Sequence, residues 1–138
     1  MAGSFKDATE TAVLDHITGK TTYTLPTTVA VGLYTAAPTD STAGTEVTNA
    51  NAYARKDTSG TDWNAASAGS TSNVNDLAFP QATGSWGTVN SFATSDSATY
   101  GGGSQIVWGD LTASKAIGNG DTAKFAGGTP GDLVFTLD

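Results

Sequence analysis

From about residue 28 to the C-terminus, apolar residues occur in short runs or alternate with polar ones, and Gly, Pro, Asn and Asp separate these segments. The most regular run is "VAVGLYT" at residues 29–35, which leads into the turn-forming "AAPTD". Such patterns are typical of β-strands. We therefore predict strands at residues 28–35, 53–58, 74–79, 86–95, 105–111, 122–125 and 133–137. Strands this short and this numerous favour an antiparallel β-sandwich or a barrel-like domain.

The N-terminal segment has a different rhythm. Apolar residues between positions 4 and 18 recur with the spacing of one helix face. Ser4 is a suitable N-cap and Gly19 is suitable for the C-terminal end of a helix. The predicted organisation is one domain over residues 1–138, with a short N-terminal helix at 4–18 followed by a mainly β domain at 28–137.

Large apolar side chains are scarce. Leu, Ile, Val and Phe account for 23 of the 138 residues, about 17%, which is below the roughly 20% under which highly charged chains become disordered. The net charge of −7 is modest for this length, and three Trp and four Tyr add residues that can be buried. We therefore predict an ordered domain with a thin core. Such a domain gains stability from a partner surface, because anything that binds only the folded state stabilises it by mass action.

Charge and composition exclude several classes of partner. Six Lys and Arg stand against 13 Asp and Glu, so the chain lacks the clustered basic side chains that neutralise nucleic-acid phosphates. It has no Cys, which excludes disulfides and thiolate metal sites. The N-terminus "MAGSFKDATETAVLD" carries carboxylates where a signal peptide is apolar, and no window reaches the roughly 18 apolar residues of a membrane span. We expect no nucleic-acid partner, no membrane partner, and synthesis in a cytoplasm.

The sequence offers no recognisable catalytic set. His16 is the only histidine and follows Asp15 directly, but adjacent residues on a helix face different directions and cannot form a hydrogen-bonded pair. The G-x-S-x-G pattern of a nucleophilic serine is absent. The common zinc sites need three or four N or S ligands. We therefore predict no catalytic residue, no metal site, no cofactor and no enzyme activity.

Carboxylates leave two other chemistries open. Eleven of the 13 acids are Asp, and most stand in turn contexts such as "PTD", "SGTD", "NGD" and "GGTPGD", where Asp hydrogen-bonds nearby backbone. A pair of carboxylates could serve a small glycosidase, and loop Asp could bind calcium. The calcium-loop pattern D-x-[DN]-x-[DN]-G is absent. Turn stabilisation is the favoured interpretation.

Aromatic residues in the predicted loops indicate contact positions. Trp63 and Tyr100 lie in long tracts of Ser, Thr, Gly and Ala, and loops of such length are usually functional or mobile. Aromatic rings of this kind anchor protein interfaces, whereas Trp86 and Trp108 lie in predicted strands and are expected in the core. The predicted protein-contact residues are Phe5, Val13, Ile17, Trp63 and Tyr100.

Several longer strings carry a resemblance to a known family. They are "LDHITGKTTYTLPTTVAVGLYTAAPTDSTAGTEV", "YARK", "FPQATGSWGTV", "GDLTASKAIGNGDTAKF" and the closing "GDLVFTLD". Taken together, over essentially the whole chain, they resemble a family of small structural proteins of tailed bacteriophages. The resemblance implies a virion component, and the members carry loose labels such as tail fibre. After Trp86 the chain departs from that pattern, in the more polar segment around Tyr100.

Within a virion, the first interpretation is a capsid decoration (cement) protein on the outside of the head. A compact acidic β domain with loops over its neighbours suits that role, and an acidic surface is tolerated outside the shell. The expected partners are the major capsid protein and copies of the chain itself as a homotrimer, and the expected location is the capsid surface. The alternative is a tail-associated or tail-fibre structural protein that binds host-surface carbohydrate.

Overall fold

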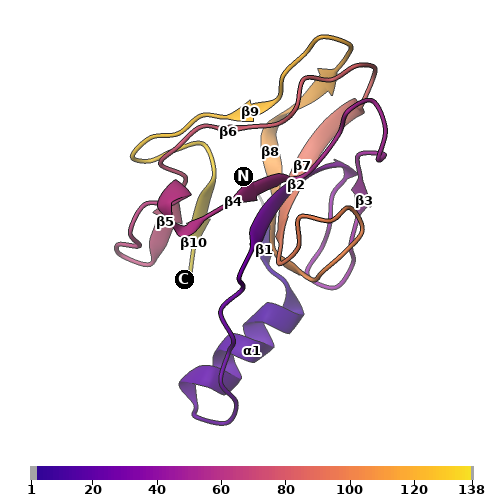
Figure 1. Cartoon of the computed structure of the whole chain (residues 1–138). Coiled ribbons are helices and arrows are strands. Elements are labelled where there is room, and N and C mark those ends of the chain that lie inside the picture. Colours follow the sequence, from indigo (N-terminus) through magenta and orange to yellow (C-terminus); the bar gives the residue numbers. More distant parts are fainter. Residues whose placement is uncertain (1–2, 138) are drawn as a thin grey trace.

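Two layers of antiparallel β-structure face one another, and a single helix projects from one end of them (Figure 1). The computed structural model describes residues 3–137. Strands make up 38% of the chain and helices 10%, which confirms the predicted mainly β, sandwich-like fold with a short N-terminal helix. The elements are β1 (Gly3–Phe5), α1 (Asp7–Ile17), β2 (Val29–Ala36), β3 (Thr45–Glu46), β4 (Lys56–Thr58), the 3-10 turn η1 (Gly60–Asp62), β5 (Ser70–Ser72), β6 (Leu77–Ala78), β7 (Gly87–Ser95), β8 (Gln105–Ile117), β9 (Lys124–Phe125) and β10 (Val134–Thr136).

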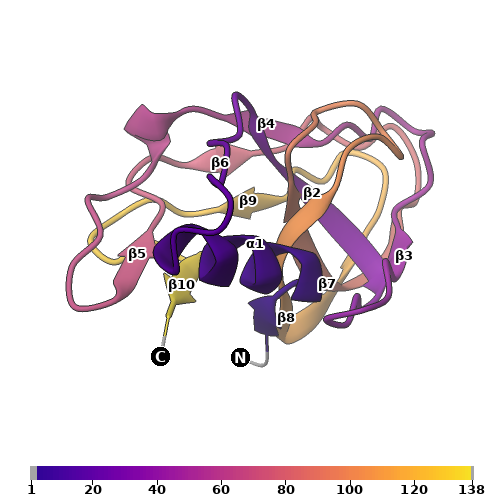
Figure 2. The same ribbon diagram turned by 90° about the horizontal axis from the view of Figure 1, so that it is seen from below.

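One layer is the larger sheet, with the strand order β1-β8-β7-β2-β3. The strand β4 also pairs with β2, at Val29–Val31, so β3 and β4 share the edge of β2 that faces away from β7. The other layer consists of two short ribbons, β10 with β5 and β6 with β9. Seen from below, these ribbons lie across from the larger sheet while α1 lies in front of both (Figure 2). The helix is therefore an appendage to the sandwich and not part of its core.

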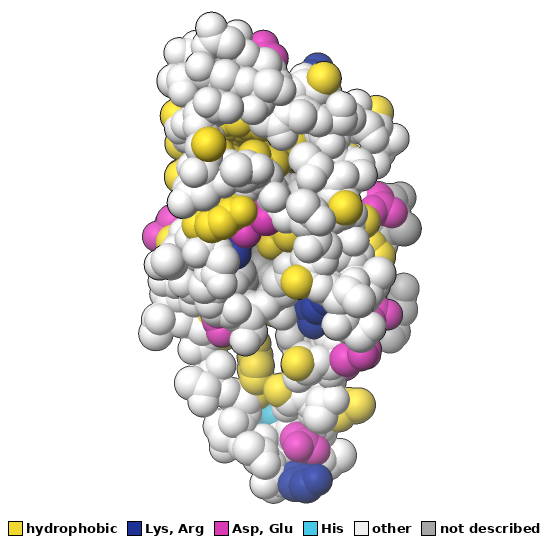
Figure 3. All heavy atoms as spheres, turned by 90° about the vertical axis from the view of Figure 1, so that its right-hand side faces the viewer, with side chains coloured by type: hydrophobic (Ala, Val, Ile, Leu, Met, Phe, Trp, Pro, Cys, Tyr) yellow, Lys and Arg dark blue, Asp and Glu magenta, His cyan; other side chains and the backbone are white. Residues whose placement is uncertain are grey.

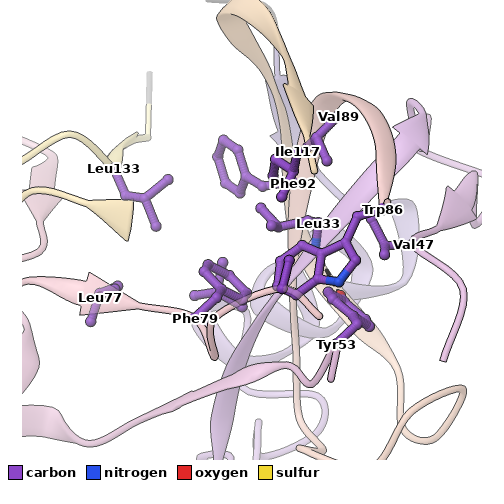
Figure 4. Close-up of a cluster of buried hydrophobic side chains, with 12 residues drawn as sticks. Leu33, Val47, Tyr53, Leu77, Phe79, Trp86, Val89, Phe92, Ile117 and Leu133 are labelled. Atoms are coloured by element: carbon purple, nitrogen blue, oxygen red, sulfur yellow. Dashed lines mark hydrogen bonds between the residues drawn. The ribbon is translucent and has the colours of Figure 1, made fainter. Parts of the chain in front are cut away.

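The core fills the space between the layers (Figure 4). The larger sheet contributes side chains such as Leu33 and Val89, and the facing segments contribute Leu77 and Leu133. Phe92 on β7 is 1% exposed and joins the layers, because its ring lies 5.8 Å from that of Phe125 and 6.2 Å from that of Phe135. A few aromatic rings thus replace the aliphatic bulk that the composition lacks.

The predicted helix begins too early in the chain. Residues 3–5 form β1, which pairs with Val107–Gly109 of β8, so Ser4 is not the N-cap. The N-cap is Lys6, whose backbone is extended and whose side chain is turned away to donate to the carbonyl oxygens of Thr39 and Thr42. At the C-terminal end the helix stops at Ile17, one residue before the predicted end, and Thr18 is the C-cap in place of the predicted Gly19. Gly19 comes directly after the C-cap Thr18 with φ of 76°, the left-handed conformation that ends many helices.

Strand positions agree best where strands are central. The predicted 28–35 and 86–95 correspond closely to β2 and β7. The predicted 105–111 is too short, because β8 continues to Ile117 through a bulge: Ser91 pairs with Asp110 and Val89 with Lys115. Side chains 112–116 in this stretch are exposed, so they carry no alternating apolar pattern. The segment 53–58 is strand only at its end, and the sequence pattern does not predict β1, β3 or β5.

The structure predicts a large effect of truncating Phe92. Phe92→Ala removes the ring that packs on Phe125 and Phe135, and we expect the free energy of unfolding to fall by about 3–5 kcal/mol. Urea denaturation followed by tryptophan fluorescence measures the loss. Phe92→Leu keeps most of the buried volume and is the matched control, with a clearly smaller loss expected. Equal losses in the two variants would contradict the central position of this ring.

Candidate functional site

An apolar groove of about 460 Å³ runs between the N-terminal segment and the β5–β10 ribbon. Its walls include Phe5 of β1, Leu25 in the segment that follows the helix, and Trp63, Phe135 and Leu137 from the facing layer. None of the described residues that line it is charged, and its few polar atoms belong to hydroxyl groups and backbone. A groove of this chemistry suits an apolar protein surface far better than a charged or highly polar ligand.

Local structure fixes Trp63 in this groove. The side chain of Asp62 accepts a hydrogen bond from the backbone N–H of Ser59, which closes a capping box at the start of η1, and Trp63 follows η1 in an extended conformation. This hydrogen bond lowers the pKa of Asp62 below its usual value. The Trp63 indole N–H donates to the hydroxyl of Thr58 at 3.2 Å, and the Trp63 ring lies 5.1 Å from that of Phe135. With its polar atom bonded internally, Trp63 presents carbon to the groove.

Four aliphatic side chains near the groove and the helix are unusually exposed. Leu14 is 58% exposed, Ile17 70%, Leu25 80% and Leu137 61%. The tapered end of the molecule that α1 forms shows hydrophobic groups beside acidic and basic ones (Figure 3). Burying a Leu or Ile fully is worth about 1.5–3 kcal/mol, so this surface has much to gain from a partner. It is the principal candidate for a contact surface.

The structure brings together only some of the predicted contact residues. Phe5 and Trp63 line the same groove. Ile17 is exposed on α1, whereas Val13 on the same helix is half-buried. Tyr100 lies elsewhere, in the turn between β7 and β8.

Three further apolar residues that are more than half exposed are not predicted from the sequence: Leu14, Leu25 and Leu137. Leu14 could have been found from its three-residue spacing to Ile17, which places both on one face of the helix. Leu25 lies in a polar stretch without periodicity, so no pattern points to it.

A buried ion pair between Arg55 and Glu46 lies beside Gly32 of β2. The Arg55 guanidinium donates to both carboxylate oxygens of Glu46 at 2.8 Å, and the two side chains are only 5% and 9% exposed. The Tyr53 hydroxyl donates to Glu46 and accepts from the backbone N–H of Leu33. Burial, with Glu46 close by, raises the pKa of Tyr53 far above its usual value, so this phenol stays protonated. Gly32 leaves the room that the pair needs, since an added Cβ would lie 3.0 Å from Glu46 Oε1.

The same arginine holds the turn between β7 and β8. One guanidinium nitrogen, Nη1, donates to the carbonyl oxygens of Ser97 and Gly102 at 2.8 and 2.9 Å. The carboxylate of Asp96 accepts from the backbone N–H of Ser104 at 2.6 Å and closes the turn. Tyr100 at its tip is 40% exposed, and its ring lies 6.3 Å from the ring of Tyr53. The turn is therefore a fixed feature of the surface.

Beside this turn lies a polar groove of about 570 Å³. Asp7, Asp40, Ser41 and Gln105 line it together with residues 101–104. Asp40 accepts from the indole N–H of Trp108 at 2.9 Å. This groove presents carboxylate, hydroxyl and amide groups, in contrast to the apolar groove. Lys6 and Arg55 also line it, but their cationic groups donate to Thr42 and Glu46 of the chain itself. Its chemistry suits a neutral, hydroxyl-rich ligand.

A third cavity, of about 690 Å³, lies between β8 and β9. Its charged side chains are engaged within the chain: Lys124 pairs with Asp76 at 2.8 Å, and Asp132 accepts from the backbone N–H of Ala126 at 2.7 Å. Asp121 likewise accepts from the backbone N–H of Gly118. The predicted turn-stabilising use of Asp is confirmed for Asp62, Asp121 and Asp132, whose carboxylates accept nearby backbone N–H groups. In the predicted "PTD" turn, the Asp40 carboxylate instead accepts from the distant Trp108 indole.

Within residues 3–137, no group of three or more His, Cys, Asp or Glu is placed to hold a metal ion. His16 is exposed, and its Nδ1 accepts from the backbone N–H of Tyr23 at 3.1 Å, which ties the segment after the helix back to α1. No helix in this part of the chain has the length and hydropathy to cross a membrane.

Comparison with protein families identifies the relatives of this chain. Residues 4–131 match the family described as podophage GP4 fiber I protein gp80. The chain belongs to this family. The gp80 family is a family of phage virion structural proteins, so the chain is a virion component, as its sequence resemblance implied. The matched residues include the linings of the polar and the apolar groove, except for Phe135 and Leu137 of the apolar groove. No curated protein matches the chain.

The ion pair supplies a stability prediction for this site. Arg55→Met leaves Glu46 buried without its partner, and we expect the free energy of unfolding to fall by about 3–5 kcal/mol. Adding Glu46→Gln removes the uncompensated charge and should restore part of that loss. Lys124→Met breaks an ion pair of the same length that is half exposed, and it should cost far less than Arg55→Met because water already screens this pair. Urea denaturation compares the variants, and similar losses for Arg55 and Lys124 would contradict this prediction.

Proposed function

We propose that this chain is a structural subunit of a phage fibre or another tail-associated assembly. The description of its family as a fiber protein supports this role over the capsid decoration role. The exposed aliphatic side chains of the α1 end and the adjoining apolar groove support a chain that is built into an assembly. The proposed partners are copies of the chain itself and neighbouring virion proteins.

The role we propose is not catalytic. The carboxylates of Asp62, Asp121 and Asp132 bind backbone amides, and Glu46 is neutralised by Arg55. Carboxylates used in this way are structural and are not free to act as the acid and nucleophile of a glycosidase.

We further propose that the subunit binds host-surface carbohydrate through the β7–β8 turn. Ser and Gly dominate this turn around Tyr100, and small residues of this kind supply adaptable hydrogen bonding beside an aromatic ring. Arg55 and Asp96 fix the turn before any ligand arrives, which reduces the ordering cost of binding. The aromatic face of Tyr100 and the polar groove beside it together offer stacking and hydrogen bonding. The carboxylates of Asp7 and Asp40 favour a neutral saccharide over an acidic one.

Binding to cells of the phage's own host tests the carbohydrate role. We expect the purified chain to bind these cells and Tyr100→Ala to bind about tenfold more weakly, equivalent to about 1.4 kcal/mol. Val74→Ala, a change at a similarly exposed position away from the turn, is the matched control and should bind as the unmodified chain does. Periodate oxidation of the cell surface should abolish binding. If protease treatment of the cells abolishes binding and periodate oxidation does not, the receptor is a protein, which would contradict the proposal.

Capsid decoration is the second candidate. The acidic balance of the chain, −7 overall, favours a position on the outside of the head, away from packaged DNA. In that case the major capsid protein would be the main partner, and the exposed aliphatic side chains would lie against the capsid lattice.

A cryo-EM map of the intact particle distinguishes the two candidates. We expect density that fits residues 3–137 in fibres or at the tail. Density repeated over the head lattice would replace the fibre role by decoration. Gold-labelled antibodies against the chain provide an independent readout of the same position.

A further inference from the structure

We propose that Tyr34 and Gln105, in the lining of the polar groove, form a specificity-determining subsite that binds one hydroxyl group of a neutral saccharide. This inference deepens the carbohydrate role proposed above, on which it rests, by naming the groups that recognise the ligand. Residues 101–104 of the β7–β8 turn line the same groove. The subsite therefore adjoins the turn that carries Tyr100.

Tyr34 is turned away from the core and towards the polar groove. Its neighbour in β2, Leu33, points into the core (Figure 4), and successive side chains of a strand point to opposite faces of the sheet. Tyr34 lies opposite Glu46 of β3 and is only 3% exposed, although it lines the groove. The phenol is therefore held in place before any ligand binds.

The side-chain amide of Gln105 has only one possible orientation. Its nitrogen, Nε2, donates to the Tyr34 hydroxyl oxygen at 2.8 Å and to the carbonyl oxygen of Ala43 at 2.9 Å. A carbonyl oxygen only accepts, so the amide cannot be flipped to bring its own oxygen against Ala43. Burial raises the pKa of Tyr34 above its usual value, so the phenol keeps its hydrogen. The Tyr34 hydroxyl thus accepts from Gln105 and keeps that hydrogen for another partner.

One donor and one acceptor therefore remain for a ligand. Among the hydrogen bonds within residues 3–137, none uses the hydrogen of the Tyr34 hydroxyl and none reaches Oε1 of Gln105. The two groups are close together, because Oε1 belongs to the same amide as the nitrogen that contacts the hydroxyl. A buried polar group that lacks a partner costs stability, so a ligand that satisfies both groups gains affinity.

This pairing of donor and acceptor determines the chemistry of the ligand. A hydroxyl group both accepts and donates at one oxygen, so it can accept from Tyr34 and donate to Oε1 of Gln105. A carboxylate or a phosphate only accepts, and an ammonium group only donates. The carboxylates of Asp7 and Asp40 in the same groove also disfavour an anion. The subsite therefore selects a ligand that presents hydroxyl groups without negative charge, as a neutral saccharide does.

Removal of single polar groups tests the subsite in the binding assay with host cells. Tyr34→Phe deletes the hydroxyl and leaves Gln105 bonded to Ala43. We expect it to bind about tenfold more weakly than the unmodified chain, which corresponds to the loss of about one hydrogen bond. Gln105→Met should weaken binding as well, and the double variant should bind no more weakly than the weaker single one, because both groups bind one ligand hydroxyl. Tyr23→Phe, which deletes a phenol hydroxyl in the apolar groove, is the matched control and should bind normally.

NMR of the unmodified, nitrogen-15-labelled chain gives a readout that needs no substitution. Polysaccharide released from the surface of host cells is the probe, and we expect it to shift the side-chain amide signals of Gln105. Bound polysaccharide that leaves these signals in place would overturn the subsite.

The cell-binding results separate the subsite from the carbohydrate role. Normal binding by Tyr34→Phe together with weakened binding by Tyr100→Ala would overturn the subsite, with solvent alone satisfying its two groups, and would leave the carbohydrate role intact. If the unmodified chain bound neither the cells nor the polysaccharide, the carbohydrate role itself would be overturned, and the subsite with it. Circular dichroism verifies that each variant keeps the fold.

Discussion

The Arg55–Glu46 ion pair holds together β3, the segment that follows it and the β7–β8 turn. Glu46 belongs to a two-residue strand, Tyr53 and Arg55 to the irregular segment after it, and Ser97 and Gly102 to a turn more than forty residues further on. None of these segments has enough regular hydrogen bonding to hold itself in place. One guanidinium with its donors in a fixed fork satisfies a carboxylate and two carbonyl groups at once. The desolvation of both charges costs stability. The pair nevertheless holds these three segments in one defined arrangement.

The remainder of the fold shows how a chain with few large aliphatic residues forms a core. Phe92 contacts Phe125 and Phe135 across the two layers, and Tyr53 packs edge-on to Trp86 at 5.2 Å. Rings cover a large area per residue, so a few of them are enough to join two thin sheets. Short turns locked by Asp carboxylates replace longer strands as the means of fixing the ribbons. The abundance of Asp in the sequence thus has a structural cause.

The sequence was informative where burial imposes a pattern. The strands β2 and β7 are buried along most of their length, and their apolar runs were sufficient to predict them. The strand β1 could not be found, because three residues pair with β8 by backbone hydrogen bonds that leave no trace in the side chains. The exposed part of β8 was missed for a related reason. In the site, Phe5 and Trp63 were predicted separately as contact residues, but their meeting in one groove depends on the tertiary arrangement. The role of Arg55 was not predicted, because its partners in the β7–β8 turn are distant in sequence.

Both ends of the described chain lie next to the apolar groove, since Phe5 at the end of β1 lines it and Leu137 forms one of its lips. An affinity tag or a fluorescent protein fused next to Phe5 or Leu137 would therefore emerge beside the groove that we propose as a contact surface. Tagged preparations would report a weakened assembly even if the native chain associates well.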